Sequence, residues 1–259
     1  MSYEYELEIA IKAAKAATVK ILAVYSQGIV VKTKQDDTPV TRADMEANET
    51  ICSILKEAFP EHAILSEEFA DDLSRLEKEF CWIVDPLDGT KEFVKMNDEF
   101  SINIALVRGR EVILGLIYMP VFEELYYAIK GQGAFTVGPT GKKRSIRVSK
   151  RSHKLRILKS RSHHASRYTE LLEASKDRIA STKCAGSAYK GCLIAKGDCD
   201  LYYNFGKTMV WDTASMDLII TEAGGYFAQT DGTPFEYNVK NTINKKGFMA
   251  MNLKANCLQ

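Results

Sequence analysis

The sequence predicts a mixed α/β fold, and three observations predict it. Two amphipathic helices lead the chain, a run of strands follows them, and helices then alternate with strands. The hydrophobic side chains repeat at helical spacing in the first 60 residues, and from residue 63 they form the short apolar runs that are typical of strands. Helices and strands combined in this order indicate sheets whose faces are covered by helices.

Residues 4 to 25 form the first predicted helix, and a second begins after Thr41, which can cap it, and ends before Pro60. A polar loop around Lys34 to Pro39 joins the two. The apolar positions of both helices recur every three to four residues, with charged residues on the opposite face. They are Leu7, Ala10, Ile11, Ala14, Ala17, Ile21 and Leu22 in the first helix, and Ala47, Ile51, Ile54, Leu55 and Ala58 in the second.

The strands of the first half start at residue 63 with AILSEE, and FCWIVD then forms an apolar strand that is expected to stop at DPLDGT. SINIALVRG and EVILGLIYMPV predict an antiparallel pair that turns at Arg108 to Arg110, and LYYAIKGQGAFTVG predicts another pair. The Gly- and Lys-rich stretch GPTGKKRSIR (138–147) is interpreted as a junction. We therefore expect an N-terminal α+β subdomain (1–145) and a C-terminal α/β subdomain (146–259).

The second half alternates between the two kinds of element. Asp212 is expected to open the last long helix, which closes on a glycine pair. The predicted strands are RILKS, DLYYNF, GYFAQTDGTPF and FMAMN, and the predicted helices are RYTELLEASK, SAYKGCLIAKG and DTASMDLIITEAGG. This alternation predicts a second α/β layer.

The composition excludes several classes of protein. The 259 residues carry 35 Lys and Arg against 34 Asp and Glu, so the net charge of +1 argues against a nucleic-acid partner bound through bulk basicity. The six cysteines contain no C-x-x-C pair, which argues against a zinc ribbon and for reduced, mostly buried thiols. The N-terminus mixes acids with apolar residues, and no uncharged apolar run reaches the ~18 residues of a membrane span. We therefore expect a cytoplasmic protein without an integral membrane segment.

The stretch WIVDPLDGTKEF (82–93) predicts a metal site. A strand delivers Asp85 at its end, Pro86 forces a turn, and Asp88 follows before Gly89 redirects the backbone. The two carboxylates and the carbonyl of Leu87 would then face one point. Oxygen ligands of this kind suit Mg²⁺, and no His or Cys lies nearby to favour zinc. The alternative is an ordinary Asx-rich turn, since D-P and D-G pairs are common in loops.

Two further acids extend this prediction. Glu67 ends a strand, and Asp212 lies at the start of a helix, whose N-terminal amides could also receive a phosphate. Taken singly, Glu67 suits a solvated surface acid and Asp212 suits an N-cap. Like charges gathered at one place repel unless a cation neutralises them, so the set as a whole favours a metal centre.

Two separated motifs resemble the signatures of a known family. DPLDGTKEF, followed about 120 residues later by WDTASMDLIITEAGG, is similar to the paired motifs of the inositol monophosphatase superfamily of magnesium-dependent, lithium-sensitive phosphatases. The resemblance runs from about residue 5 to residue 252 and includes DDTPVTRAD, ILSEE, DEFSINIALV, LGLIYMPV and GSAYKGCLIAKG. It implies a layered αβαβα sandwich of the inositol monophosphatase and fructose-1,6-bisphosphatase type.

Details of the motifs resemble one branch, the 3'(2'),5'-bisphosphate nucleotidases. They are Lys91 and Glu92 after DGT, where inositol monophosphatases usually read DGTTNF, the stretch LKSRSHH, and GSAYK with its Lys190. The branch implies removal of the 3'-phosphate of 3'-phosphoadenosine 5'-phosphate to give AMP, and in some members the same step on 3'-phosphoadenosine 5'-phosphosulfate. It also implies a place in sulfur assimilation and a small phosphorylated nucleotide as partner, with monomer and homodimer both open.

The resemblance also implies roles for the metal-site residues. Two or three Mg²⁺ would be held by Glu67, Asp85, the Leu87 carbonyl, Asp88 and Asp212. Asp44 and Thr90 match the pair that orients and deprotonates the nucleophilic water. Considered on its own, Asp44 suits a capping box with Thr41, and both roles are compatible.

Substrate contacts are implied for Gly89, Thr90, Ser160, His163, Gly186, Lys190 and Asp212. Lys190 would supply a point charge for a second phosphate, a group that inositol monophosphate lacks. His163 alone suits a surface residue in a basic loop. Tyr189 and Phe205 could stack on adenine or belong to the core, and Lys91 and Glu92 would shape their loop.

Two positions depart from the branch. Asn204 stands where many bacterial members carry Arg in Y-P-R-F-G, with Lys207 as a possible substitute for that charge, and Ser66 stands where Gly is usual. Two alternatives therefore remain open: an inositol monophosphatase or other sugar phosphatase, for instance one acting on fructose 1,6-bisphosphate, and an inactive nucleotide or metal sensor.

Overall fold

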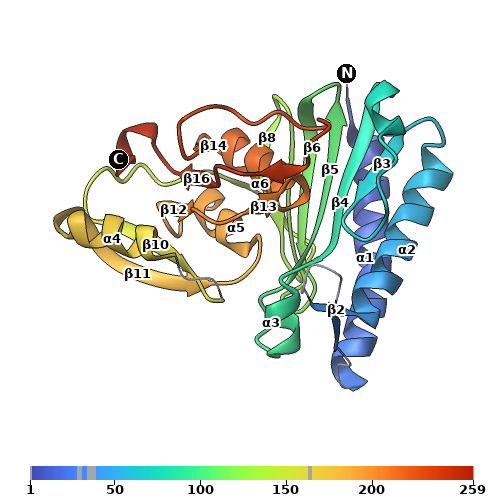
Figure 1. The fold of residues 1–259 in the computed structure, drawn as a ribbon, viewed down its shortest axis with the longest axis horizontal. Coiled ribbons are helices and arrows are strands. Elements are labelled where there is room, and N and C mark those ends of the chain that lie inside the picture. The colour runs from blue at the N-terminus through green and yellow to red at the C-terminus, as the bar shows by residue number, and fades with distance from the viewer. Residues whose placement is uncertain (1, 28–30, 34–38, 163–164, 259) are drawn as a thin grey trace.

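The protein folds into five layers that alternate between helices and sheets, which confirms the predicted αβαβα sandwich. The computed structural model describes residues 2–27, 31–33, 39–162 and 165–258. In Figure 1 the layers run from the paired helices α1 and α2, through a large sheet, a central helical layer and a smaller sheet, to helix α4 on the far side.

The helices and strands have the following bounds. The helices are α1 (Glu4–Gln27), α2 (Arg42–Ala58), α3 (Thr90–Val94), α4 (Ser166–Ala174), α5 (Tyr189–Ala195) and α6 (Val210–Glu222), with 3₁₀ turns η1 (Ser74–Glu77), η2 (Lys176–Arg178) and η3 (Lys254–Asn256). The strands are β1 (Val31–Thr33), β2 (Pro39–Thr41), β3 (Ala63–Ser66), β4 (Phe80–Asp88), β5 (Ser101–Arg108), β6 (Glu111–Met119), β7 (Glu124–Ile129), β8 (Gly133–Val137), β9 (Lys143–Ile146), β10 (Leu155–Ser160), β11 (Ile179–Ala185), β12 (Leu201–Asn204), β13 (Thr208–Met209), β14 (Tyr226–Gln229), β15 (Ile243–Asn244) and β16 (Phe248–Met251).

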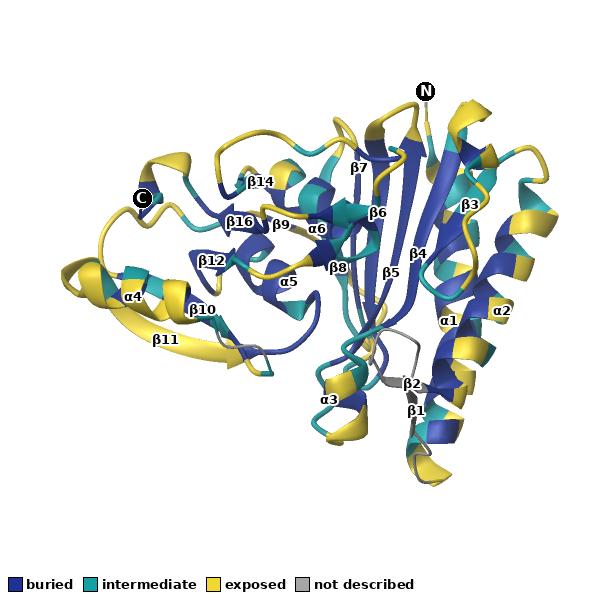
Figure 2. Cartoon of the chain, viewed as in Figure 1, coloured by how far each residue is buried: buried dark blue, intermediate teal, exposed yellow. Residues whose placement is uncertain are grey.

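The large sheet has the strand order β3-β4-β5-β6-β7-β8-β9, and all its neighbours are antiparallel except β3 and β4. The predicted pairs 101–109 with 111–121 and 125–129 with 133–138 are therefore present as β5-β6 and β7-β8. The apolar stripes of α1 and α2 cover one face of this sheet and enclose a core around Trp82, Phe93 and Phe100. Figure 2 shows its central strands almost entirely buried.

The central helices α5 and α6 pack between the two sheets. A Cβ added to Gly115 of β6 would lie 2.9 Å from the carbonyl oxygen of Ser215 on α6, and one added to Gly191 of α5 would lie 2.3 Å from Cγ of Met216. Glycine at these two positions therefore permits the close approach of α6 to the large sheet and to α5. The smaller sheet, of order β11-β10-β12-β16-β14, packs on the other side of these helices.

The structure corrects two details of the sequence prediction and adds two strands, β9 and β11. Strand β4 does not stop before DPLDGT but continues to Asp88, because a register shift around Pro86 lets the strand absorb a residue that cannot donate to the ladder. The stretch 138–147 contains β9, one of the two edge strands of the large sheet. Helix α6 begins at Val210, so Asp212 lies in its first turn rather than opening it. Strand β11 had no counterpart in the prediction.

All six cysteines lie in the described chain as free thiols, four of them buried, with Cys184 exposed and Cys257 half-buried. No helix in the described ranges is long and apolar enough to cross a membrane. The predicted loop from Lys34 to Pro39 falls mostly outside the described residues.

Candidate functional site

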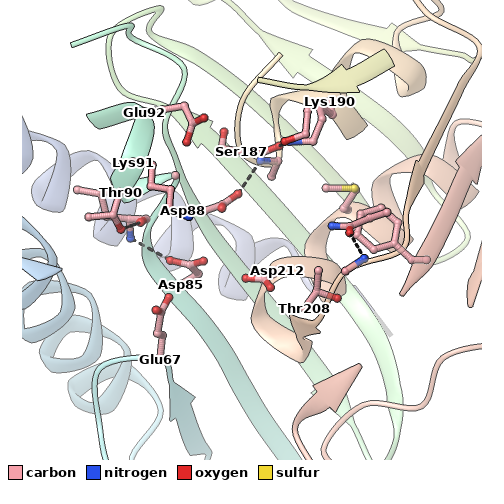
Figure 3. Close-up of a pocket in the computed structure, with 18 of the residues that line it drawn as sticks. Glu67, Asp85, Asp88, Thr90, Lys91, Glu92, Ser187, Lys190, Thr208 and Asp212 are labelled. Atoms are coloured by element: carbon pink, nitrogen blue, oxygen red, sulfur yellow. Dashed lines mark hydrogen bonds between the residues drawn. The ribbon is translucent and has the colours of Figure 1, made fainter. Parts of the chain in front are cut away.

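A cavity of about 420 Å³ opens where the end of β4 meets α3, α5, α6 and β12. Figure 3 shows carboxylates from both halves of the chain pointing into it. The lining residues are Glu67, Asp85, Leu87, Asp88, Gly89, Thr90, Lys91, Glu92, Ser160, Ser187, Ala188, Lys190, Tyr202, Asn204, Gly206, Lys207, Thr208, Asp212, Met216 and Phe248. Most of the residues that the sequence nominated therefore share one cavity.

Local backbone geometry explains how β4 presents its acids. The register shift lies between Asp85, which pairs with Asn103, and Asp88, which pairs with Ser101. Asp85 Oδ1 accepts a hydrogen bond from the Leu87 amide at 3.1 Å, which closes an Asx turn across Pro86. Gly89 follows with φ +90°, a conformation that favours glycine, and α3 begins at the next residue.

Asp88 is held from two sides. Its Oδ2 accepts a hydrogen bond from the Ala188 amide at 2.5 Å, across the cleft from β4. Ser101 Oγ and Asn103 Nδ2, both on β5, donate to the same oxygen at 3.4 Å. These buried polar residues alternate on a strand that is otherwise apolar, a pattern that identifies them as site neighbours and that the sequence analysis did not use.

Three carboxylates form a compact cluster. Ligand oxygens of Asp85, Asp88 and Asp212 lie within 4.8 Å of one another, and Glu67 enters the same cavity from the end of β3. Burial raises the pKa of all three clustered acids, and the neighbouring carboxylates raise the pKa of Asp85 and Asp212 further. Such a set is costly without a counter-ion, and it consists only of oxygen donors. These residues therefore fit a hard divalent cation such as Mg²⁺.

Asp44 and Thr90 lie at the edge of this cluster. Thr90 Oγ1 donates to Asp44 Oδ1 at 3.3 Å and lies 3.4 Å from the Leu87 carbonyl oxygen. Asp44 is 2% exposed, and its Oδ2 accepts from both the amide and the hydroxyl of Thr41, at 2.8 and 2.6 Å. The capping box is confirmed, and the same carboxylate keeps its second oxygen on Thr90.

Lys190 marks the opposite side of the cavity. It is 7% exposed, donates from Nζ to the Ser187 carbonyl at 2.7 Å and lies 5.3 Å from the ring of Tyr202. Burial lowers the pKa of Lys190, while the charge of Asp88 opposes that shift. Ser160, at the end of β10, also lines the cavity. Lys190 is thus a buried cation that faces the acidic cluster across the cleft (Figure 3).

Some nominated residues lie elsewhere. Gly186 is outside the cavity lining, and its amide donates to Glu99 Oε2 at 2.7 Å. Phe205 stacks on Tyr203 with centroids 5.5 Å apart, and Tyr189 packs beside Phe122, so both belong to aromatic clusters instead of the cavity wall. His163 lies outside the described residues.

The cavity also contains residues that the sequence analysis missed. Tyr202 and Phe248 supply its aromatic surface, and Ser187 and Thr208 supply hydroxyl groups. Tyr202 and Asn204, two residues apart on β12, both line the cavity, and Tyr203 between them does not, as the period of two in a strand predicts.

The residues at the end of β12 also line the cavity. Asn204 Oδ1 accepts from the Gly206 amide at 2.8 Å, which makes an Asx turn, and both residues line the cavity together with Lys207. Lys91, Lys190 and Lys207 thus bring positive charge to the cavity that holds the acids, and Lys91 lies on the same side as Thr90 and Asp88 (Figure 3). The net charge of +1 is a sum over the whole chain, and this cavity contains charges of both signs.

This chain is similar to known proteins over almost its whole length. Residues 2–257 match the inositol monophosphatase family. The 3'(2'),5'-bisphosphate nucleotidase CysQ of Salmonella typhimurium is 36% identical over 245 residues, which cover 93% of this chain and 98% of that protein.

Two solved structures superpose closely. CysQ from Bacteroides thetaiotaomicron, a bacterial member of the inositol monophosphatase family, has a TM-score of 0.84 at 33% identity and covers 96% of this chain and 98% of its own. An inositol monophosphatase from Thermotoga maritima has a TM-score of 0.82 at 27% identity, with 95% and 92% covered. By its sequence, its fold and the motif that carries its acidic cluster, the chain belongs to the inositol monophosphatase family.

Proposed function

We propose that this protein is a Mg²⁺-dependent phosphatase that removes the 3'-phosphate of 3'-phosphoadenosine 5'-phosphate to give AMP. The observation that carries the proposal is the cavity itself, where an acidic cluster faces the buried cation of Lys190. A bisphosphate can place its reacting phosphate at the first and its second phosphate at the other. The printed names of the CysQ relatives support the same substrate class.

Members of the family are generally Mg²⁺-dependent, and this chain has the acidic cluster for it. We assign two or three ions to Glu67, Asp85, the Leu87 carbonyl, Asp88 and Asp212. Bound Mg²⁺ would neutralise the phosphate charge and lower the pKa of the attacking water.

Asp44 and Thr90 would orient that water and take its proton. The Thr90 hydroxyl donates to Asp44 Oδ1, so its own oxygen is turned to accept a proton from a water in the cavity. The hydrogen bonds from Thr41 hold Asp44 in place for this role. In this role the pair would position the nucleophile for attack in line with the departing 3'-oxygen.

The substrate would lie between the two halves of the chain. Gly89, Thr90 and Asp212 would contact the reacting phosphate, while Ser160, His163 and Lys190 would contact the nucleotide. Gly186 would act through the turn that it begins, because its amide already binds Glu99. In this proposal residues 146–259 supply the contacts to the nucleotide, and they also supply Asp212 to the reacting phosphate.

A panel of substrates tests the function. Phosphate release is measured with 3'-phosphoadenosine 5'-phosphate, its 5'-phosphosulfate analogue, adenosine 3'-monophosphate and inositol 1-phosphate, with Mg²⁺, with EDTA and with added Li⁺. We expect the highest kcat/KM with 3'-phosphoadenosine 5'-phosphate. In EDTA we expect no phosphate release from any of the substrates. Faster turnover of inositol 1-phosphate would overturn the assignment and favour an inositol monophosphatase, the second candidate, which the similarity to the Thermotoga structure supports. No turnover of any substrate would favour the inactive sensor.

Substitution of Lys190 tests the second phosphate contact. Lys190→Met removes the buried charge and keeps much of the side-chain volume. We expect KM for 3'-phosphoadenosine 5'-phosphate to rise by about tenfold or more, with a smaller rise for adenosine 3'-monophosphate. Lys183→Met, at an exposed position on β11, is the matched control. An equal loss on both substrates would remove the proposed role.

Two further expectations stay predictions, namely a cytoplasmic location and a monomeric or homodimeric state. Cell fractionation tests the first and sedimentation equilibrium the second.

A further inference from the structure

A carboxylate outside the cavity joins the two halves of the molecule. Glu99, two residues before the start of β5, accepts two hydrogen bonds from Arg161, from Nε at 2.8 Å and from Nη2 at 2.7 Å. Its Oε2 also accepts from the Gly186 amide at 2.7 Å. Glu99 thus bridges the end of β10 and the turn that leads into α5. Glu99, Arg161 and Gly186 together are called the Glu99 bracket below.

The bracket is stronger than an ordinary surface ion pair. The Glu99 side chain is only 14% exposed, the Arg161 contact is bidentate, and a backbone amide supplies the third bond. Removal of the carboxylate would leave the amide of buried Gly186 without this acceptor.

The two bridged segments carry the proposed substrate contacts. Arg161 directly follows Ser160, and its amide donates to the Ala185 carbonyl at 3.2 Å. Gly186 begins the turn from Gly186 to Lys190, whose Ala188 amide binds Asp88 and whose Ser187 carbonyl binds Nζ of Lys190.

The turn from Gly186 to Lys190 is closely packed against Glu92 and Glu99. A Cβ on Gly186 would lie 2.6 Å from Cγ of Glu92 and 2.8 Å from the Glu99 carbonyl oxygen, and Ser187 adopts a left-handed φ of +42°. A residue in that region is strained and needs its surroundings to hold it. The bond from Gly186 to Glu99 lies directly before this residue.

Glu99 itself is anchored in the N-terminal half. Its amide donates to Asn97 Oδ1 at 3.1 Å. The preceding residue, Asp98, accepts from the hydroxyl of Tyr25 on α1 at 2.8 Å, and its amide donates back to that hydroxyl at 3.2 Å. The carboxylate therefore holds the C-terminal turn against a support built from α1 and β5.

We propose that Glu99 is a positioning residue that sets the place of the turn from Gly186 to Lys190 and so determines the affinity for the second phosphate of a bisphosphate substrate. The proposal rests on the proposed function. Asp88 should keep its place without the bracket, because it lies in β4 and also interacts with Ser101 and Asn103. Lys190 depends on the turn for its position. The KM for a bisphosphate should therefore respond more than kcat.

The test compares Glu99→Ala and Glu99→Gln, using 3'-phosphoadenosine 5'-phosphate and adenosine 3'-monophosphate, which lacks the 5'-phosphate. We expect Glu99→Ala to raise KM for the bisphosphate about tenfold or more, with kcat for both substrates and KM for the monophosphate within about threefold of the original. Glu99→Gln keeps an acceptor for Gly186 but loses the charged pair, so its effect should be intermediate.

Hydrogen exchange supplies a readout that is independent of turnover. Amide exchange in residues 185–190 should be about tenfold faster in Glu99→Ala. The control is Glu79→Gln, which removes the ion pair between Glu79 Oε1 and Arg108. This pair lies beside the start of β4, the end of that strand away from the cavity, so the variant should change neither exchange in 185–190 nor KM.

The outcomes separate the two proposals. If the original protein hydrolyses the bisphosphate but the ratio of the two KM values stays within about twofold in Glu99→Ala, this inference is wrong. Unchanged exchange in 185–190 would also overturn it. Absence of bisphosphate turnover in the original protein would instead refute the proposed function. Should Glu99→Ala fail to fold, Glu99→Gln and Arg161→Lys carry the same comparison.

Discussion

The first turns of α2 and α6 share a local geometry and differ in what surrounds them. In each, an aspartate at the third helical position accepts the amide of the residue before the helix: Asp44 from Thr41 at 2.8 Å, and Asp212 from Met209 at 2.7 Å. Asp44 is buried, and its second oxygen accepts from Thr90. Asp212 lies in the cavity wall within the acidic cluster.

This difference shows that a helix cap does not by itself define a functional role. The same hydrogen bond holds both carboxylates still. Only the neighbours decide whether the remaining oxygen meets a hydroxyl, which suits proton transfer, or other carboxylates, which suits a cation.

Substitution within the cluster should have the largest effect on activity. Asp212→Asn keeps an oxygen that can accept from the Met209 amide but removes one of the charges that attract Mg²⁺. We expect kcat to fall by about 10³-fold or more, and the stabilisation by Mg²⁺ to shrink, because the metal contributes through binding. The measurements are phosphate release and the Tm with and without Mg²⁺.

Asp88→Asn should lose turnover in the same way with little loss of folding. In EDTA, the Tm of Asp212→Asn should not fall, since this variant removes a charge that repels Asp85. Full activity in Asp88→Asn would refute the metal assignment.

Asp44→Asn should have the next largest effect, and of a different kind. The side-chain oxygen of the asparagine can still accept from the Thr41 amide. The carboxylate oxygen that accepts from the Thr90 hydroxyl is replaced by an amide nitrogen. We expect kcat to fall by about 10² to 10⁴-fold with the Mg²⁺-dependent rise in Tm preserved. Loss of that rise would place Asp44 among the metal ligands and erase the contrast with Asp212.

The pH dependence of stability should also distinguish the two helix starts. The pKa values of Asp85, Asp88 and Asp212 are raised in the folded state, so the stability that their protonated forms contribute is present at low pH and is lost as pH rises through those values. In EDTA, Tm should therefore fall as the pH rises. Mg²⁺ binds the deprotonated acids, so its stabilising effect should grow with pH. Asp212→Asn should flatten both trends and Asp44→Asn should not.

Asp217, also on α6, should show the smallest effect. Burial raises its pKa from 3.8 to about 7, while the hydroxyl of buried Tyr237, which donates to it at 2.9 Å, opposes the shift. The stability contributed by protonated Asp217 is thus present below about pH 4 and is lost as pH rises through 7. We expect Asp217→Asn to gain about 1–2 kcal/mol relative to the original between pH 5 and 8, with kcat unchanged. Chemical denaturation at the two pH values measures this. An identical pH profile would contradict it.

Much of the fold follows from local patterns. The stripes of α1 and α2, the cap on Thr41 and the hairpins of the large sheet involve residues close together in the chain, so periodicity and turn chemistry suffice to predict them. Strand β11 was missed because it is largely exposed and polar, and its pairing with β10 is parallel, so no hairpin marks it. The extension of β4 was missed because Pro86 resembles a strand end, and only pairing with β5 carries the strand past it.

The candidate site likewise contains residues that local sequence patterns predict and residues that only tertiary packing brings together. The sequence by itself determined the acids of the DPLDGT motif, the second motif around Asp212 and the capping box of Asp44, since each depends on residue type and short spacing. Only the tertiary structure decided that Asp212 lies close to Asp85 and that the Gly186 amide donates to Glu99. It also decided that Tyr202, and not Phe205, lines the cavity. Those contacts join residues far apart in the chain, and they depend on how α6 and the smaller sheet pack against the large sheet.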